Sequence, residues 1–202
     1  MSLWLAPSRL VLASRSMVRR SMLESAGIAV DVRPADVDER AIEYAAAGRK
    51  PGEIAVLLAR AKARTVTAEL AGRLVLGADQ TLALAGRCFV KPADRTAAAE
   101  QLSTLAGRTH ELHSAVTVMS DGATLYEHVD TARLTMRRFS EGFLQMYLAA
   151  AGDSVNESVG GYQLEKLGSQ LFERIEGDHF TILGLPLLPF LAFLRRQGLI
   201  AA

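Results

Sequence analysis

The apolar positions of this chain alternate between a strand-like run and a helix-like spacing. A short apolar run at residues 9–14 predicts a buried strand, and the segment 18–27 predicts a helix closed by a glycine. Residues 28–34 predict a second strand. Pro51 opens a helix that we expect to reach about Leu70, because apolar residues recur along one of its faces. The first third of the chain therefore alternates strand and helix.

The rest of the sequence adds strands that pair antiparallel. Two short strands are expected at 73–78 and 80–86, followed by a helix capped by Asp94. Alternating residues on both sides of the turn residues Asp121 and Gly122 predict an antiparallel pair. The remaining predicted elements are a helix from Ser140 to about Ala150, short strands around Leu171 and Phe180, and a helix after Pro186. Together these elements indicate an α/β fold with a mixed sheet.

Composition bounds the class of protein. The chain has 202 residues, 50% of them hydrophobic, which is enough for one domain or two closely packed lobes. Its 23 basic and 22 acidic residues nearly cancel, so we expect no nonspecific binding to nucleic acid. Prolines and arginines interrupt the apolar C-terminal segment, so we expect neither a membrane span nor a targeting signal. A lone cysteine, Cys88, excludes an internal disulfide and favours the cytoplasm.

The segment "LVLASRSMVRR" runs from a predicted strand through a serine-rich turn into a helix. Ser14 and Ser16 supply hydroxyls there, while Arg19 and Arg20 lie in the first helical turn. Hydroxyls, free backbone N–H groups and a guanidinium at a helix N-terminus can bind phosphate oxygens. The alternative is an ordinary solvated first turn.

Two acidic positions follow predicted strands. The segment "DVDER" places Asp36, Asp38 and Glu39 at a strand end, where carboxylates could hold hydrated Mg²⁺. Gly77 is expected to let the backbone turn closely before Asp79, which would place that carboxylate at the carboxyl edge of the sheet. Acidic loops are common, so each position alone also fits a purely structural interpretation.

A third candidate segment is "GGYQLE". Gly160 and Gly161 precede Tyr162 and suggest positive φ angles or a close approach to a ligand, with Glu165 just beyond. A glycine turn feeding a hairpin is the alternative. No P-loop, HExxH or GxSxG motif is present, and the four histidines lack metal-ligand spacing, so we expect them on strand or loop surfaces.

In combination these segments resemble the Maf proteins, which are nucleoside triphosphate pyrophosphatases. The resemblance extends from about Leu10 to about Arg196 and rests on "LASRSMVRRSMLE", "DVDE", "LARAKA", "GADQ", "GRCFVKP" and "LFERIEGDHFTILGLPL". It implies a single Maf/ITPase-like unit over residues 1–202, with two lobes, a twisted mixed sheet flanked by helices and a central cleft. It also implies a homodimer and hydrolysis of a nucleoside triphosphate to the monophosphate and pyrophosphate with a divalent cation, Mg²⁺ or Mn²⁺.

The resemblance implies roles for particular residues. Asp79 takes the position of the catalytic aspartate, which accepts a proton from the attacking water or holds the metal, and Glu39 is its acidic partner. Lys62 and Lys91 take the positions of two lysines. Attack at the α-phosphorus builds negative charge that Arg19, these lysines and Mg²⁺ would stabilise.

Three positions bear on the choice of base. Val18 stands where the family has the first arginine of "SPRR", and Gln80 and Glu165 resemble the branch active on 7-methyl-GTP, which usually has Trp in place of Val18. A carboxylate at Glu165 could accept two hydrogen bonds from the N1–H and N2 amino groups of guanine. The alternatives are a dTTP/UTP pyrophosphatase, a phosphatase that removes the terminal phosphate, and a nucleotide-binding regulator of cell division without turnover.

Overall fold

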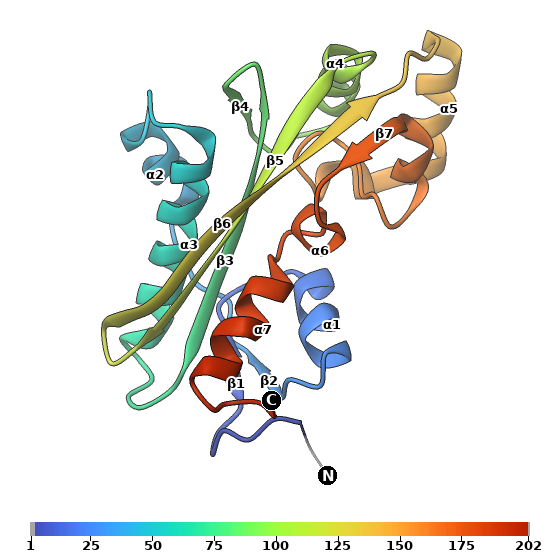
Figure 1. Ribbon diagram of the computed structural model, residues 1–202. Coiled ribbons are helices and arrows are strands. Elements are labelled where there is room, and N and C mark those ends of the chain that lie inside the picture. Colours follow the sequence, from blue (N-terminus) through green and yellow to red (C-terminus); the bar gives the residue numbers. More distant parts are fainter. Residues whose placement is uncertain (1–2, 202) are drawn as a thin grey trace.

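The computed structural model describes residues 3–201 as a mixed α/β structure with one seven-stranded sheet (Figure 1). The strands are β1 (Leu10–Leu12), β2 (Val30–Val32), β3 (Val75–Leu84), β4 (Arg87–Phe89), β5 (Thr109–Ser120), β6 (Ala123–Met136) and β7 (Phe172–Glu176). The helices are α1 (Met17–Ser25), α2 (Glu39–Ala45), α3 (Pro51–Thr67), α4 (Arg95–Leu105), α5 (Glu141–Ala151), α6 (His179–Ile182) and α7 (Leu187–Arg196). Two 3₁₀ helices, η1 (Gly152–Asn156) and η2 (Leu167–Leu171), lie between α5 and β7. The predicted α/β class with a mixed sheet is confirmed.

The sheet combines a parallel edge with a long antiparallel part. Its strand order is β2-β1-β3-β5-β6-β7, and β4 pairs with β3. β1 runs parallel to both β2 and β3, and the other pairs are antiparallel. β1 ends at Leu12, which pairs with Leu76, and Asp79 follows a little further along β3. Asp79 therefore lies just beyond the carboxyl end of β1, although β3 itself continues to Leu84. Ligands bind near such carboxyl ends in open α/β sheets.

β3 is one continuous strand, so the two separate strands predicted from the sequence are wrong. Asp79 pairs in register with Ala115 of β5, and the same register runs from Val75 to Ala83. A polar residue interrupts the apolar pattern of a strand without interrupting its backbone hydrogen bonds, which do not depend on the side chain. The carboxylate consequently leaves the sheet from the middle of a long strand.

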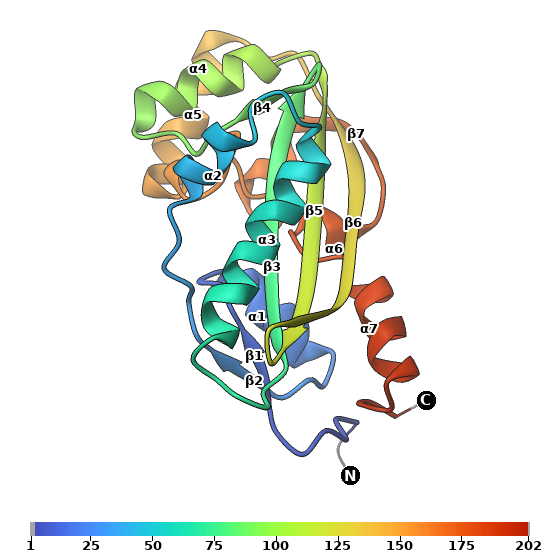
Figure 2. The same cartoon turned by 90° about the vertical axis from the view of Figure 1, so that its left-hand side faces the viewer.

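Helix α3 lies along one face of β3 and β5 (Figure 2). Ala55 and Ala59 of α3 and Ala115 of β5 form a buried cluster of small side chains at this contact. A Cβ on Gly77 of β3 would fall on the carbonyl oxygen of Ala59 and 2.8 Å from the amide nitrogen of Ala63. Gly77 therefore permits a close approach of helix and strand, and the turn that we expected there does not form.

Two hydrophobic clusters lie at opposite ends of the long strands. One gathers β1, α1 and α7 around the fully buried Phe190, and the other joins Leu102 of α4 and Leu148 of α5 to Leu134 of β6. Figure 1 shows α1 and α7 at one end of the sheet and α4 and α5 at the other. The middle of β3 thus lies between two separately packed regions.

Two short helices differ from the prediction. The strand expected around Phe180 is helix α6, whose N-cap Asp178 accepts hydrogen bonds from the amides of Phe180 and Thr181. Helix α2 was not predicted, and its N-cap Asp38 accepts from the amide of Ala41 at 3.0 Å. Both helices are too short for a clear apolar period. Within residues 3–201, no helix combines the length and the apolar character needed to cross a membrane.

Candidate active site

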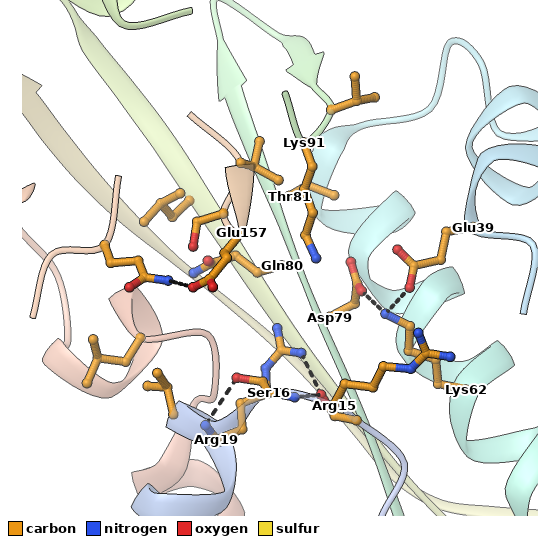
Figure 3. A pocket seen from close by; sticks show the side chains of 18 of the residues that line it. Arg15, Ser16, Arg19, Glu39, Lys62, Asp79, Gln80, Thr81, Lys91 and Glu157 are labelled. Carbon is orange, nitrogen blue, oxygen red and sulfur yellow. Dashed lines mark hydrogen bonds and ion pairs between the residues drawn. The ribbon is translucent and has the colours of Figure 1, made fainter. Parts of the chain in front are cut away.

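A cavity of about 1010 Å³ opens beside the middle of β3 (Figure 3). Its walls come from the β1–α1 turn, the segment before α2, helices α2 and α3, strand β3, the segment after β4 and residues 156–166. The cavity is lined by ten residues for which the sequence predicted a part in catalysis, phosphate binding or substrate choice: Ser14, Ser16, Val18, Arg19, Glu39, Lys62, Asp79, Gln80, Lys91 and Glu165. Arg20, which the sequence grouped with Arg19, does not line it. The fold brings these distant segments together.

One ammonium group joins two carboxylates at the centre of the cavity. Nζ of Lys62 lies 2.5 Å from Oδ1 of Asp79 and 2.8 Å from Oε1 of Glu39 (Figure 3). The side chains of Lys62 and Asp79 are each 10% exposed, whereas that of Glu39 is 46% exposed. The close packing of α3 on β3 places Lys62 against Asp79, and the start of α2 supplies Glu39.

The cavity shifts the pKa values of the two carboxyl groups in opposite directions. Burial raises the pKa of Asp79, although the charges of Lys62 and Arg19 oppose this shift. Burial also favours the neutral form of Glu39, but the hydrogen bond and charge of Lys62 outweigh it and lower the pKa of Glu39. Burial lowers the pKa of Arg19, and both carboxylates counteract that effect. The pKa values of the two carboxyl groups are therefore shifted in opposite directions.

The two serines hold the turn between β1 and α1. Ser16 caps α1, because its Oγ accepts a hydrogen bond from the amide of Arg19 at 3.3 Å. Oγ of Ser14 accepts from the amide of Ser16 at 3.3 Å and from Nη1 of Arg19 at 3.2 Å. Each hydroxyl keeps its own hydrogen, which it can donate to a phosphate oxygen.

Arg19 is fixed by main-chain oxygens from two other segments. Its Nε donates to the carbonyl of Gly184 at 2.7 Å, and Nη1 donates to the carbonyl of Ala78 at 3.0 Å. Gly184 has φ +93°, and a Cβ there would lie 3.1 Å from Nη2 of Arg19. Arg20 instead pairs with Glu24 at 2.8 Å on the exposed side of α1. The structure thus separates the two arginines that the sequence grouped together.

Gln80 connects β3 to helix α6. Its Nε2 lies 2.8 Å from Oγ of Ser114, 3.1 Å from the carbonyl oxygen of Thr181 and 3.0 Å from that of Ile182. Because these acceptors occupy the amide N–H groups, Gln80 can offer a ligand in the cavity its carbonyl oxygen. Its predicted part in base selection is therefore limited to accepting a hydrogen bond.

The predicted glycine turn is present in the segment that carries Glu165. Gly160 has φ +85° and Gly161 has φ +74°, as expected for positions that favour glycine. The hydroxyl of Tyr162 lies 2.7 Å from Nε2 of His110, which is 1% exposed. The expectation that His110 lies on a strand surface is wrong, since it fills the contact between β5 and this segment. Burial lowers the pKa of His110 to about 4.

The same segment forms a wall rich in hydrogen-bond acceptors. Nε2 of Gln163 donates to Glu157 at 2.9 Å. Within the described part of the chain, the buried oxygens Oδ1 of Asn156 and Oε1 of Gln163 have no hydrogen-bond partner. Glu165 lines the cavity with an exposed side chain. This wall suits a ligand group with several N–H donors.

The side chain of Lys91 points toward Asp79 (Figure 3), whereas that of Val18 packs against a hydrophobic cluster. Lys91 follows β4, and Figure 3 shows its side chain pointing toward Asp79. The charge of Lys91 contributes to the lowered pKa of Glu39. Val18 lies in the first turn of α1 and packs against the hydrophobic cluster around Phe190. The first helical turn thus offers the cavity no charge at Val18.

Comparison with known proteins identifies the family of this chain. Residues 9–197 match the family model described as Maf-like protein. The chain belongs to the Maf family. A nucleoside triphosphate pyrophosphatase of Rhodopseudomonas palustris is 58% identical over 201 residues, covering 100% of both chains. A 7-methyl-GTP pyrophosphatase of Rhizobium etli is 50% identical over 194 residues, covering 95% of this chain and 98% of the relative.

Among solved structures, a dITP/XTP pyrophosphatase of Mycobacterium abscessus is similar to this Maf protein with a TM-score of 0.44. The two chains are 17% identical, and the match covers 95% of this chain and 96% of the other.

Five charged residues that line the Maf cavity were not predicted: Arg15, Arg40, Glu43, Glu157 and Lys166. Arg15 stands between the two serines of the β1–α1 turn and lines the cavity. The feature of the sequence that could have indicated Arg15 was a positive charge between the two serines of "SRS". Glu43 lies one turn after Glu39 on α2, and burial and the charges of Asp79 and Glu39 raise its pKa. Glu43 could have been found only by predicting helix α2.

The carboxylates of the Maf cavity fit a divalent cation whose remaining ligands are oxygens of the substrate. Asp79 and Glu39 each use one oxygen to contact Lys62, which leaves the second carboxylate oxygen of each for a metal ion. No group of three or more His, Cys, Asp or Glu side chains within residues 3–201 is arranged to hold a metal. The acidic group predicted at Asp36, Asp38 and Glu39 therefore does not form a metal site by itself. One or two carboxylates completed by phosphate oxygens are typical of Mg²⁺.

Proposed function

We propose that this Maf protein hydrolyses a nucleoside triphosphate at the α-phosphorus. The oxygen of water forms a bond to that phosphorus, the bond to the bridging oxygen breaks, and the products are a nucleoside monophosphate and pyrophosphate. Membership of the Maf family and the names of its relatives support a hydrolase acting on nucleoside triphosphates. The observation that carries the proposal is a buried carboxylate, Asp79, whose pKa is raised and which faces a cavity with cationic side chains.

In this proposal Asp79 orients the attacking water and accepts its proton. A carboxylate with a raised pKa is a better general base than an ordinary one, because its conjugate acid is more stable at the working pH. Lys62 holds Asp79 in place and, with Lys91 and Arg19, faces the charge that builds on the phosphate oxygens. Because hydrogen bonds already fix Arg19, stabilising that charge requires little rearrangement. Ser14 and Ser16 would donate their hydroxyl hydrogens to phosphate oxygens.

The proposed cofactor is a divalent cation, Mg²⁺ or Mn²⁺. Asp79 and Glu39 would hold it together with phosphate oxygens of the substrate. When bound, the cation supplies charge that neutralises the phosphates and the leaving pyrophosphate.

We further propose that the base is of the guanine type, with 7-methyl-GTP as a candidate substrate. The wall formed by residues 156–166 presents acceptors, and the edge of guanine presents two adjacent N–H donors to a carboxylate such as Glu165. Uracil and thymine present one donor between two carbonyls, which a carboxylate repels. The 7-methyl-GTP pyrophosphatase of Rhizobium etli supports this choice, and a dTTP/UTP pyrophosphatase is the alternative.

Product analysis tests the reaction. The enzyme with Mg²⁺ is given GTP, 7-methyl-GTP, ITP, UTP, dTTP and CTP, and pyrophosphate and orthophosphate are measured separately. We expect pyrophosphate from a guanine nucleotide and its loss in Asp79→Asn. Orthophosphate as the product would indicate a terminal phosphatase, and binding without turnover would indicate a regulator; either result contradicts the proposal.

Exchange of one carboxylate tests base selection. We expect Glu165→Gln to reduce the preference for GTP over UTP, because an amide can also donate to a carbonyl. Unpaired polar groups can reject a wrong substrate by up to ~10⁴-fold. The matched control is Glu173→Gln, which makes the same charge change at an exposed position of β7 outside the cavity lining. Equal ratios of kcat/KM for GTP and UTP in the wild type and Glu165→Gln would exclude this role of Glu165.

The homodimer implied by the resemblance stays a prediction, which the mass of the protein in solution tests directly. The cytoplasmic location and the absence of nucleic-acid and membrane partners also stay predictions.

A further inference from the structure

The guanidinium of Arg15 has no bonding role within the described chain. Arg15 is exposed and lines the cavity. None of the hydrogen bonds or ion pairs found within residues 3–201 involves its guanidinium. A long, flexible side chain held over a cavity without a partner has its full set of donors available to a ligand.

Two of the neighbouring cations, Arg19 and Lys62, are already engaged, whereas Lys91 points toward Asp79 (Figure 3) without a hydrogen bond or ion pair within the described chain. Arg19 uses Nε and Nη1 for the carbonyls of Gly184 and Ala78. Lys62 contacts two carboxylates, so this group of three side chains carries one net negative charge. A substrate that brings several more negative charges into this place needs additional positive charge. The planar fork of Arg15 matches phosphate oxygens in a bidentate manner.

The position of Arg15 indicates which phosphate it would meet. In Figure 3, Glu157 and Gln80 lie on one side of Asp79, while Arg15, Lys62 and Glu39 lie on the other. A nucleotide with its base on the acceptor wall and its α-phosphorus at Asp79 would extend its remaining phosphates away from Glu157. That direction leads to Arg15.

We propose that Arg15 binds the β- and γ-phosphates of the substrate and the pyrophosphate formed from them. This inference rests on the proposed function and assigns the end of the cavity that holds the leaving group. The guanidinium of Arg15 donates hydrogen bonds to oxygens of the leaving pyrophosphate. The negative charge on these oxygens increases as the bond between the α-phosphorus and the bridging oxygen breaks, so Arg15 lowers the barrier as well as binding the substrate.

The test compares Arg15→Ala and Arg15→Lys with Arg20→Ala. Arg20 lies five residues further along, inside helix α1, where it pairs with Glu24 at 2.8 Å on the exposed side. Calorimetry measures the affinity for pyrophosphate with Mg²⁺ and for the nucleoside monophosphate product, and steady-state kinetics measures kcat/KM for the triphosphate. The binding measurements need no turnover, so a failure of the proposed reaction is distinguished from a failure of this inference.

We expect Arg15→Ala to weaken pyrophosphate binding and to lower kcat/KM by about 10- to 100-fold each, the usual effect of losing a charged hydrogen bond. The affinity of Arg15→Ala for the monophosphate should stay within about twofold of the wild type. The pyrophosphate affinity of Arg15→Lys should lie between those of the wild type and Arg15→Ala, because a single ammonium lacks the bidentate fork. Arg20→Ala should match the wild type in every measurement. Unchanged pyrophosphate affinity in Arg15→Ala would overturn the inference. Equal loss of monophosphate affinity would also overturn it, because it would show that Arg15 only supports the turn.

Discussion

At the scale of residues, two carboxylates share one ammonium, and yet their pKa values shift in opposite directions. Asp79 is buried, so loss of hydration dominates and raises its pKa, whereas the more exposed Glu39 keeps water and has a lowered pKa. The sequence predicted both residues and Lys62, because acidic and basic residues at these places resemble the family's motifs. The opposite pKa shifts of Asp79 and Glu39 could not be predicted, because they depend on burial beside α3.

The first prediction concerns the pKa of Asp79. Lys62→Met should raise it, because an opposite charge and a hydrogen bond to the carboxylate are lost. Glu39→Gln should lower it, because a like charge is lost. The measurement is a ¹³C NMR titration of the Asp79 carboxyl carbon in the wild type and both variants. Shifts in the same direction in the two variants would contradict the electrostatic account of the site.

At the scale of elements, the contact between α3 and β3 sets the geometry of the site. The apolar period of the sequence predicts α3, α1, α4, α5 and the β5–β6 pair, because each of these elements is long enough to show its period. It does not predict α2 or α6, and it divides β3 at Asp79. The causes differ: α2 and α6 are too short to show an apolar period, whereas β3 was divided because a local pattern does not report which polar residue a tertiary contact accommodates.

The second prediction tests that contact. Gly77→Ala should destabilise the protein by about 3 kcal/mol or more, because its Cβ meets backbone atoms of α3 that cannot rotate away. It should also lower activity, since moving α3 separates Lys62 from Asp79. Chemical unfolding and kcat/KM measure the two effects.

The control for this change is Gly142→Ala in helix α5. A Cβ at Gly142 has Oγ of Ser140 as its nearest neighbour, at 3.9 Å. We expect a change of no more than about 1 kcal/mol, in the stabilising direction, because alanine favours helices. Similar destabilisation by both substitutions would mean that close packing at Gly77 is not required.

At the scale of the whole molecule, the cavity lies beside the middle of β3, between the hydrophobic clusters at the two ends of the sheet. Ten residues predicted from the strand–turn–helix pattern and from resemblance to Maf motifs line one cavity, whereas Arg20 does not. The sequence did not predict the supports of that cavity: the bonds of Arg19 to Gly184 and of Gln80 to α6, and the contact of His110 with Tyr162. These contacts join segments that are far apart in sequence, so no local pattern reveals them.

The third prediction concerns stability at acidic pH. The pKa of His110 is about 4 in the folded protein and about 6.5 in an unfolded chain. The unfolded state therefore binds the proton first as pH falls from 6.5 to 4, so the stability that His110 contributes is complete above pH 6.5 and is lost through this window. The loss is about 3 kcal/mol for this group.

Urea unfolding from pH 7 to pH 4 measures this effect against His110→Gln, which does not titrate. We expect the free energy of unfolding of the wild type to fall more steeply with decreasing pH than that of the variant. Parallel curves would show that His110 is not held neutral by the fold.

The most direct test of the central claim is hydrolysis of the preferred nucleoside triphosphate in H₂¹⁸O with Mg²⁺, followed by mass spectrometry of both products. Attack at the α-phosphorus beside Asp79 predicts one ¹⁸O atom in the nucleoside monophosphate and none in pyrophosphate. Asp79→Asn should slow this reaction by about 10²- to 10⁴-fold, the usual contribution of a general base. Label in pyrophosphate would place the attack at the β-phosphorus and contradict the account.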